Sequence, residues 1–185
     1  MKPLQSIAMG YVFIALYARF SGYDAYADPV GWALVLYGAY RLPAELAGRG
    51  SVLYLGWLAA LVSVPVWFPA VTDLLEDADE SLAWAVDLPQ FGFGALLCHT
   101  LSRAALADDD RRAAGWLRIL STGFVLVAVL PVLVFGAGIE GLADTAGVAV
   151  QVVQVATVWL LFLYSGRVWA GAPVVEDAAR DGESP

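Results

Sequence analysis

The chain has 185 residues, of which 60% are hydrophobic and only 15% are charged, and its formal net charge is -8. A mean hydropathy of +0.69 excludes an ordinary soluble domain, because such domains carry about 25% charged residues. The single lysine and the acidic balance argue against nucleic acid and against anionic lipid as partners, since both bind clustered cations. One cysteine and one histidine exclude an intramolecular disulfide, a cysteine-based metal site and haem held by two histidines. We expect no cofactor.

Six apolar runs follow one another along the chain. Runs of roughly 20 residues are typical of transmembrane helices. The second run is short, because its 14 residues reach only about 21 Å across a hydrocarbon core of about 30 Å. It must continue past Pro43 with a kink, thin the bilayer locally, or dip in and return. The runs are Leu4 to Phe20, Pro29 to Leu42, Val52 to Val71, Leu82 to Ser102, Ala114 to Ile139 and Thr145 to Trp169.

The placement of the cations predicts the topology. If all six runs span and the N-terminus is cytoplasmic, nine of the ten cations fall inside and only Arg19 falls outside, as the positive-inside rule requires. The outer loop between the third and fourth runs is acidic instead. The inside set is Lys2, Arg41, Arg49, Arg103, Arg111, Arg112, Arg118, Arg167 and Arg180.

These patterns predict an all-α integral membrane protein of the plasma membrane. We expect a single domain over residues 1–171, with six transmembrane helices arranged as three hairpins and both termini cytoplasmic. Residues 172–185 are polar and acidic, which predicts a disordered cytoplasmic tail. Each returning helix opens near an acid and closes near an arginine, which indicates either a threefold hairpin repeat or only the general preferences of helix ends. The acids are Asp28, Asp87 and Asp144, and the arginines are Arg41, Arg103 and Arg167.

The first run has a second interpretation. Lys2, the apolar core and Ala25-Tyr26-Ala27 resemble a cleavable signal peptide with a small-residue cleavage site. Arg19 interrupts the path from the core to that site, which favours a retained span. Cleavage would leave the topology of the other five runs unchanged.

The fourth run carries the most informative pattern in the chain. Polar and small residues recur every three or four positions, so they share one helix face that we expect to pack against protein. The sixth run repeats this spacing, which suggests that the two helices pair around Asp87, Gln90, Gln151 and Gln154. This candidate polar site would hold a cation, a proton or a small polar ligand. The alternative is structural, with Asp87 capping the fourth helix and both glutamines bonding between helices. The fourth-run residues are Asp87, Gln90, Gly94, Cys98 and Ser102.

Two further residues are secondary candidates. Asp28 precedes Pro29, a pair typical of a helix start. His99 lies near the cytoplasmic end of its run, where a histidine is more often interfacial than catalytic. Ser102 is three residues from His99, but no orienting acid accompanies the two. We therefore see no catalytic constellation and no metal-ligand spacing.

The segment Gly22-Tyr23-Asp24 through Asp28-Pro29-Val30-Gly31-Trp32 resembles a set of uncharacterised small multi-spanning proteins of Gram-positive bacteria. In that family, a stretch of glycine, aromatic residue and aspartate joins the first two spans. The resemblance covers about the first quarter of the chain and implies a membrane protein. It implies no activity and no site residues.

The favoured functional prediction is a non-catalytic component or scaffold of a membrane complex, because polar groups are few. Its partners would be the lipid bilayer and another membrane protein or further copies of the chain, with no nucleic acid. The alternative is a small transporter or channel with an outward-facing polar site between the fourth and sixth spans. An intramembrane enzyme is the third class.

Overall fold

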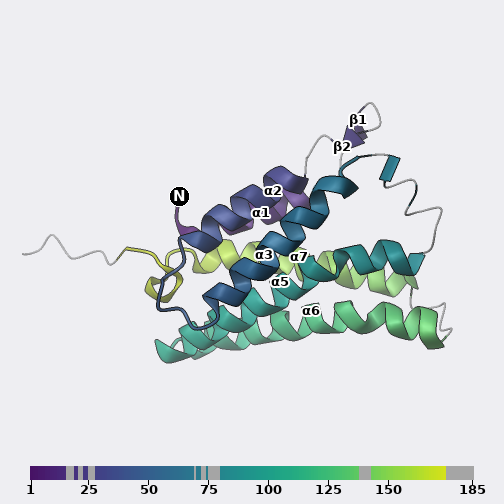
Figure 1. Cartoon of the computed structure of the whole chain (residues 1–185). Coiled ribbons are helices and arrows are strands. Elements are labelled where there is room, and N and C mark those ends of the chain that lie inside the picture. Colours follow the sequence, from purple (N-terminus) through teal and green to yellow (C-terminus); the bar gives the residue numbers. More distant parts are fainter. Residues whose placement is uncertain are drawn as a thin grey trace, which may run out of the picture.

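Six α-helices make up most of the part of the chain that the structure describes (Figure 1). The computed structural model describes residues 1–15, 19–20, 23–24, 28–68, 70–71, 74, 80–137 and 143–173. A 3-10 turn, η2 (Val168–Ala170), follows the last helix, and strand β1 (Arg19–Phe20) pairs antiparallel with β2 (Tyr23–Asp24). The helical class predicted from the sequence is confirmed. The helices are α1 (Pro3–Ala15), α2 (Asp28–Tyr40), α3 (Arg49–Val66), α5 (Glu80–Ala107), α6 (Arg111–Ala137) and α7 (Ala143–Tyr164).

Three of the described helices are long and apolar enough to cross a membrane, namely α3, α6 over Arg111–Val132 and α7 over Gly147–Tyr164. Helices α1 and α2 have 13 residues each, or about 20 Å, which is short of a core of about 30 Å. Helix α5 has 28 residues, but the polar residues along it lower its hydropathy. The prediction of six spans is therefore supported for three helices.

The ends of several runs differ from the prediction. The first helix ends at Ala15, and Arg19 and Phe20 lie in β1. The last helix ends at Tyr164, after which the chain turns and Trp169 packs back on the Tyr164 ring with centroids 5.8 Å apart. Trp169 is therefore outside the helix in which the sequence placed it. The predicted tail lies outside the described residues from residue 174 onward.

The fourth predicted helix also begins earlier than expected. Helix α5 starts at Glu80 and continues through Asp87 and Pro89. Asp87 is thus not a helix cap, and that part of the sequence interpretation is wrong. Pro89 lies inside this helix, where its missing N–H costs one intrahelical hydrogen bond.

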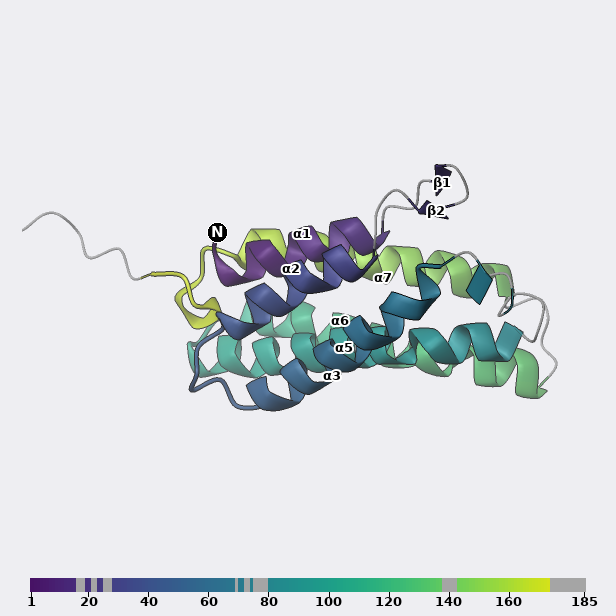
Figure 2. The same ribbon diagram turned by 45° about the horizontal axis from the view of Figure 1, so that its top comes forward.

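Each helix packs against the next in sequence, and α7 returns to α1, so the six helices form a closed ring (Figures 1 and 2). The closest pairs are α5 with α6 and α1 with α2. A short turn links α5 to α6, in which Asp109 adopts a left-handed φ of 57°. Asp110 then caps α6, because its Oδ1 accepts the Ala113 backbone N–H at 3.1 Å.

Helix α5 supplies the centre of the core. The Phe93 side chain is fully buried, and its ring lies 5.3 Å from that of Trp32 on α2 and 6.2 Å from that of Tyr11 on α1. On the other side of α5, the Phe124 ring of α6 covers Gly94. The adjacent residues Phe93 and Gly94 of α5 thus contact α1 and α2 on one side and α6 on the other.

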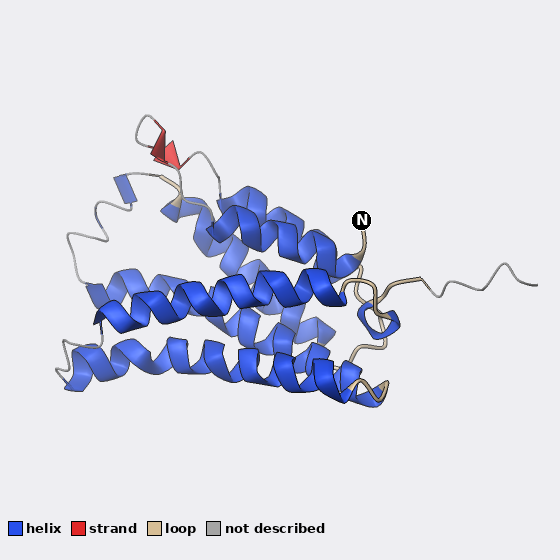
Figure 3. Cartoon of the chain, turned by 180° about the vertical axis from the view of Figure 1, so that it is seen from behind, coloured by secondary structure: helices blue, strands red, loops and turns tan. Residues whose placement is uncertain are grey.

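The cations gather at one end of the ring. The start of α1, the ends of α2, α5 and α7, and the starts of α3 and α6 all meet there, opposite the β1–β2 pair (Figure 3). Two hydrogen bonds join these ends: Arg41 donates to the Met1 carbonyl at 3.0 Å, and Arg49 donates to the Tyr40 carbonyl at 2.6 Å. The described cations at this end are Lys2, Arg41, Arg49, Arg103, Arg111, Arg112, Arg118 and Arg167.

Helices α1 and α2 approach each other through glycine. A Cβ placed on Gly10 would lie 2.5 Å from the Gly31 carbonyl oxygen and 2.9 Å from the Val35 nitrogen. These are backbone atoms, which cannot move aside as a flexible side chain can. Only glycine at this position permits the observed separation of the two helices.

We expect Gly10→Ala to lower the free energy of unfolding by about 1–3 kcal/mol, because the added methyl group overpacks a backbone contact. Gly115→Ala is the matched control, since nothing lies within 4 Å of a Cβ on that helical glycine. The control should leave stability unchanged or slightly raised. Reversible unfolding in mixed detergent micelles measures both, and equal stability of the two variants would contradict the close approach of α1 and α2.

Candidate functional site

A small polar pocket lies between α2, α3 and α5, at the end of the ring opposite most of the cations. It is lined by three polar residues predicted as candidates from the sequence: Asp28, Asp87 and Gln90. The indole of Trp32 and the hydroxyl-bearing Ser63, both buried, complete its inner wall. The cavity measures about 30 Å³, which is room for one or two water molecules or a small cation.

The polar groups of this pocket differ in exposure. Asp87 is exposed on the surface of the bundle, whereas Gln90 and Asp28 are half-buried. The Ser63 hydroxyl donates to the Ala60 carbonyl at 2.8 Å within its own helix, so its proton is already committed. The two carboxylates and one amide can therefore accept or coordinate, but the pocket offers no aligned nucleophile and base.

The two glutamines of α7 do not line this pocket. Gln151 is exposed and faces a groove between α6 and α7, while Gln154 is buried with 6% of its surface accessible. The main neighbours of α5 are α3 and α6, and those of α7 are α1 and α6. Asp87 and Gln90 thus share no pocket with Gln151 and Gln154. Asp28 lines their pocket where the glutamines were expected.

The small-residue face of α5 does pack against protein, as the spacing predicts. Gly94 lies under the Phe124 ring, and Cys98 is fully buried. Ser102 donates to the Ala114 carbonyl of α6 at 2.8 Å. The corresponding face of α7 is different, because Gly147 is exposed with nothing within 4 Å of a Cβ placed there.

His99 lies on the exposed side of α5, near the cationic end of the bundle. Ser102 is buried and its hydroxyl is used by Ala114, so these two side chains form no catalytic pair. Among the residues that the structure describes, no group of three His, Cys, Asp or Glu side chains could hold a metal ion.

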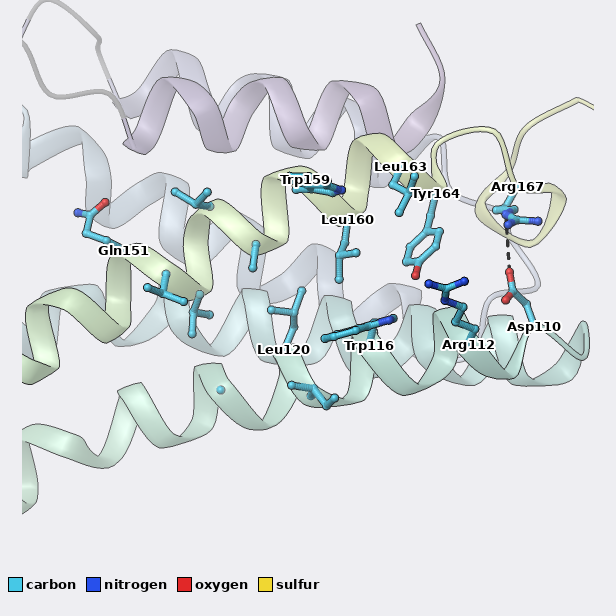
Figure 4. A pocket seen from close by; sticks show the side chains of 16 residues that line it. Asp110, Arg112, Trp116, Leu120, Gln151, Trp159, Leu160, Leu163, Tyr164 and Arg167 are labelled. Atoms are coloured by element: carbon cyan, nitrogen blue, oxygen red, sulfur yellow. Dashed lines mark ion pairs between the residues drawn. The ribbon is translucent and has the colours of Figure 1, made fainter.

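A second hollow is a wide groove that the sequence patterns did not predict. It runs between α6 and α7 with a volume of about 1,090 Å³, and most of its lining is apolar (Figure 4). Its rim includes strongly exposed apolar residues at helical spacing on α7. The sequence shows that stripe, but the pattern alone indicates only a lipid-facing helix. It does not show that α6 forms the other side of the groove. The α7 stripe is Val152, Val155, Trp159 and Leu163.

One end of this groove is charged. The Nε of Arg167 lies 3.6 Å from Asp110 Oδ2, and the Arg112 side chain lies beside this ion pair (Figure 4). The Tyr164 hydroxyl points toward the Arg112 guanidinium. The charged residues that line this end, Arg112, Arg167 and Asp110, therefore carry a net positive charge at the mouth of the apolar groove.

The functional assignment depends on this geometry alone. No family model, no curated protein and no solved structure matches the chain.

Proposed function

We propose that the chain is a multi-pass protein of the plasma membrane that acts as a non-catalytic component or scaffold of a membrane complex. In this proposal all six helices cross the bilayer as three hairpins, with both termini in the cytoplasm. The wide apolar surfaces of α3, α6 and α7 support the membrane location, because water would solvate them poorly. The short α1 and α2 require local thinning of the bilayer.

The gathering of cations at one end of the ring supports the orientation. Eight described cations share that end, whereas Arg19 belongs to β1 at the other. Arginine and lysine are retained in cytoplasmic loops. The end that holds the α5–α6 turn is therefore assigned to the cytoplasm.

Three serine hydroxyls that bond between helices are the observation that carries the non-catalytic assignment. Ser6 donates to the Leu34 carbonyl at 2.9 Å, Ser102 to that of Ala114 at 2.8 Å, and Ser121 to that of Ala95 at 2.9 Å. Each bond links two helices, so these groups contribute to packing and their protons are not free for chemistry. Such a bundle presents surfaces to partners better than it presents reactive groups to a substrate.

Cysteine labelling tests the orientation. In a Cys98→Ala background, Asp24→Cys should react with a membrane-impermeant maleimide added to intact cells, and Asp109→Cys should react only after the membrane is opened. The reason is that β2 and the α5–α6 turn lie at opposite ends of the ring. Labelling of Asp109→Cys in intact cells would overturn the topology.

Purification in mild detergent tests the component assignment. We expect the tagged chain, extracted from its own membranes, to migrate as a complex of fixed stoichiometry larger than its 19.7 kDa mass. The complex should keep the same composition in two unrelated detergents, because a packed interface does not depend on the micelle. A monodisperse monomer in both detergents would contradict this proposal.

A small transporter or channel with an outward-facing site is the second candidate function, and the pocket at Asp28, Asp87 and Gln90 favours it. Here the site lies between α2, α3 and α5. The carboxylate of Asp87 would bind a proton or a small cation at the outer end of the bundle.

For this second function we expect Asp87→Asn to abolish proton- or cation-coupled flux in vesicles. Because Asp87 is exposed, the change should alter stability by less than about 0.5 kcal/mol, so that expression stays normal. Asp109→Asn, which removes a carboxylate from the opposite end, is the control and should leave flux unchanged. Equal flux in wild type and Asp87→Asn would rule out the transporter function.

A further inference from the structure

The groove between α6 and α7 has one apolar part and one cationic mouth. Along α7 it extends from Gln151 to Tyr164, a rise of about 20 Å. A single leaflet of hydrocarbon is about 15 Å deep. The groove is therefore long enough to follow one acyl chain from the membrane surface to the middle of the bilayer.

The mouth lies where a lipid headgroup would be. Arg112 is in the first turn of α6 and Arg167 follows the end of α7, so both are at the surface when these two helices span. Trp116 and Trp159 line the groove and are 49% and 68% exposed. Their indole nitrogens point toward the charged end (Figure 4), an orientation typical of tryptophan at the membrane interface.

The charges at the mouth are only partly balanced. Asp110 has one oxygen on the Ala113 backbone N–H and the other facing Arg167. Within the part of the chain that the structure describes, the Arg112 guanidinium makes no ion pair and no hydrogen bond. An unpaired guanidinium beside a tyrosine hydroxyl offers hydrogen-bond donors of the kind that bind phosphate oxygens.

We propose that this groove is a binding site for an anionic phospholipid of the cytoplasmic leaflet. The phosphate accepts hydrogen bonds from Arg112, Arg167 and the Tyr164 hydroxyl, and one acyl chain lies between Trp116 and Trp159. Cationic pockets between transmembrane helices on the cytoplasmic side bind such headgroups in general. The composition of the chain argued against anionic lipid as a partner, but the fold brings Arg112 and Arg167, which are far apart in the sequence, to the same end of the groove.

The site rests on the proposed orientation of α6 and α7, but its test is separate from that of the topology. The chain is placed in nanodiscs of phosphatidylethanolamine mixed equally with phosphatidylglycerol, and the lipids that it retains are identified by native mass spectrometry. Wild type should retain phosphatidylglycerol selectively. Arg112→Gln should lower that retention about tenfold, the usual effect of losing one charge-assisted hydrogen bond.

Two further variants separate the groove from general surface charge. Arg111→Gln removes the neighbouring exposed arginine, which does not line the groove, and should retain phosphatidylglycerol as wild type does. Ala156→Trp fills the groove without changing charge and should lower retention as Arg112→Gln does.

Three results would overturn the site. One is equal retention in wild type and Arg112→Gln, and another is equal retention of the two lipids by wild type. The third is a high yield of cross-links between two copies through Trp159→Cys in a Cys98→Ala background, because a second protein helix would then occupy the groove. Each of these results leaves the cysteine-labelling test of topology unaffected.

Discussion

Close approach of helix backbones is the constraint on which this structure depends. Lipid chains are as apolar as leucine, so in the proposed membrane location burying Phe93 gains little from the hydrophobic effect, and shape must hold the helices together. Gly10 lets α1 reach the backbone of α2, and Gly94 provides the surface that the Phe124 ring covers. The hydroxyl bonds between helices add about 0.6 kcal/mol each. These contacts fix the ring, and the polar pocket and the groove lie where neighbouring helices pack less closely.

Much of the helical framework was predictable from the sequence, because it depends on local properties. Apolar runs and helix-start residues placed α2 within two residues of its observed ends, and Asp28 followed by Pro29 marked its start. The alternation of arginine along the chain predicted that one end of the bundle would be cationic. The three-and-four spacing on α5 also identified a protein-facing side, since Gly94, Cys98 and Ser102 are buried.

The arrangement of helices around the ring was not predictable in the same way. Periodicity shows which face of a helix is buried but not which helix covers it. The first halves of the fourth and sixth runs have equivalent patterns, yet Asp87 lies in a pocket with α2 and α3, while Gln151 faces the groove between α6 and α7. The helix-cap interpretation of Asp87 failed for a related reason: a carboxylate just before Pro89 is typical of a helix start, but α5 begins at Glu80 and continues through both residues. Both errors concern polar residues whose surroundings come from distant parts of the chain.

The arginines at the cationic end show how one feature can serve two purposes. Orientation requires only that cations lie on the cytoplasmic side, and any exposed position in the loops would satisfy that requirement. Arg103 and Arg111 are exposed near the adjoining ends of α5 and α6 and do not line the groove. Arg112 and Arg167 instead line the end of an apolar groove, and Asp110 pairs with Arg167 while it also caps α6. One carboxylate faces two arginines at this end of the groove, so the local charge is not balanced. Arg112 makes no ion pair within the described bundle, and in the proposed site a phosphate of the adjacent leaflet would pair with it.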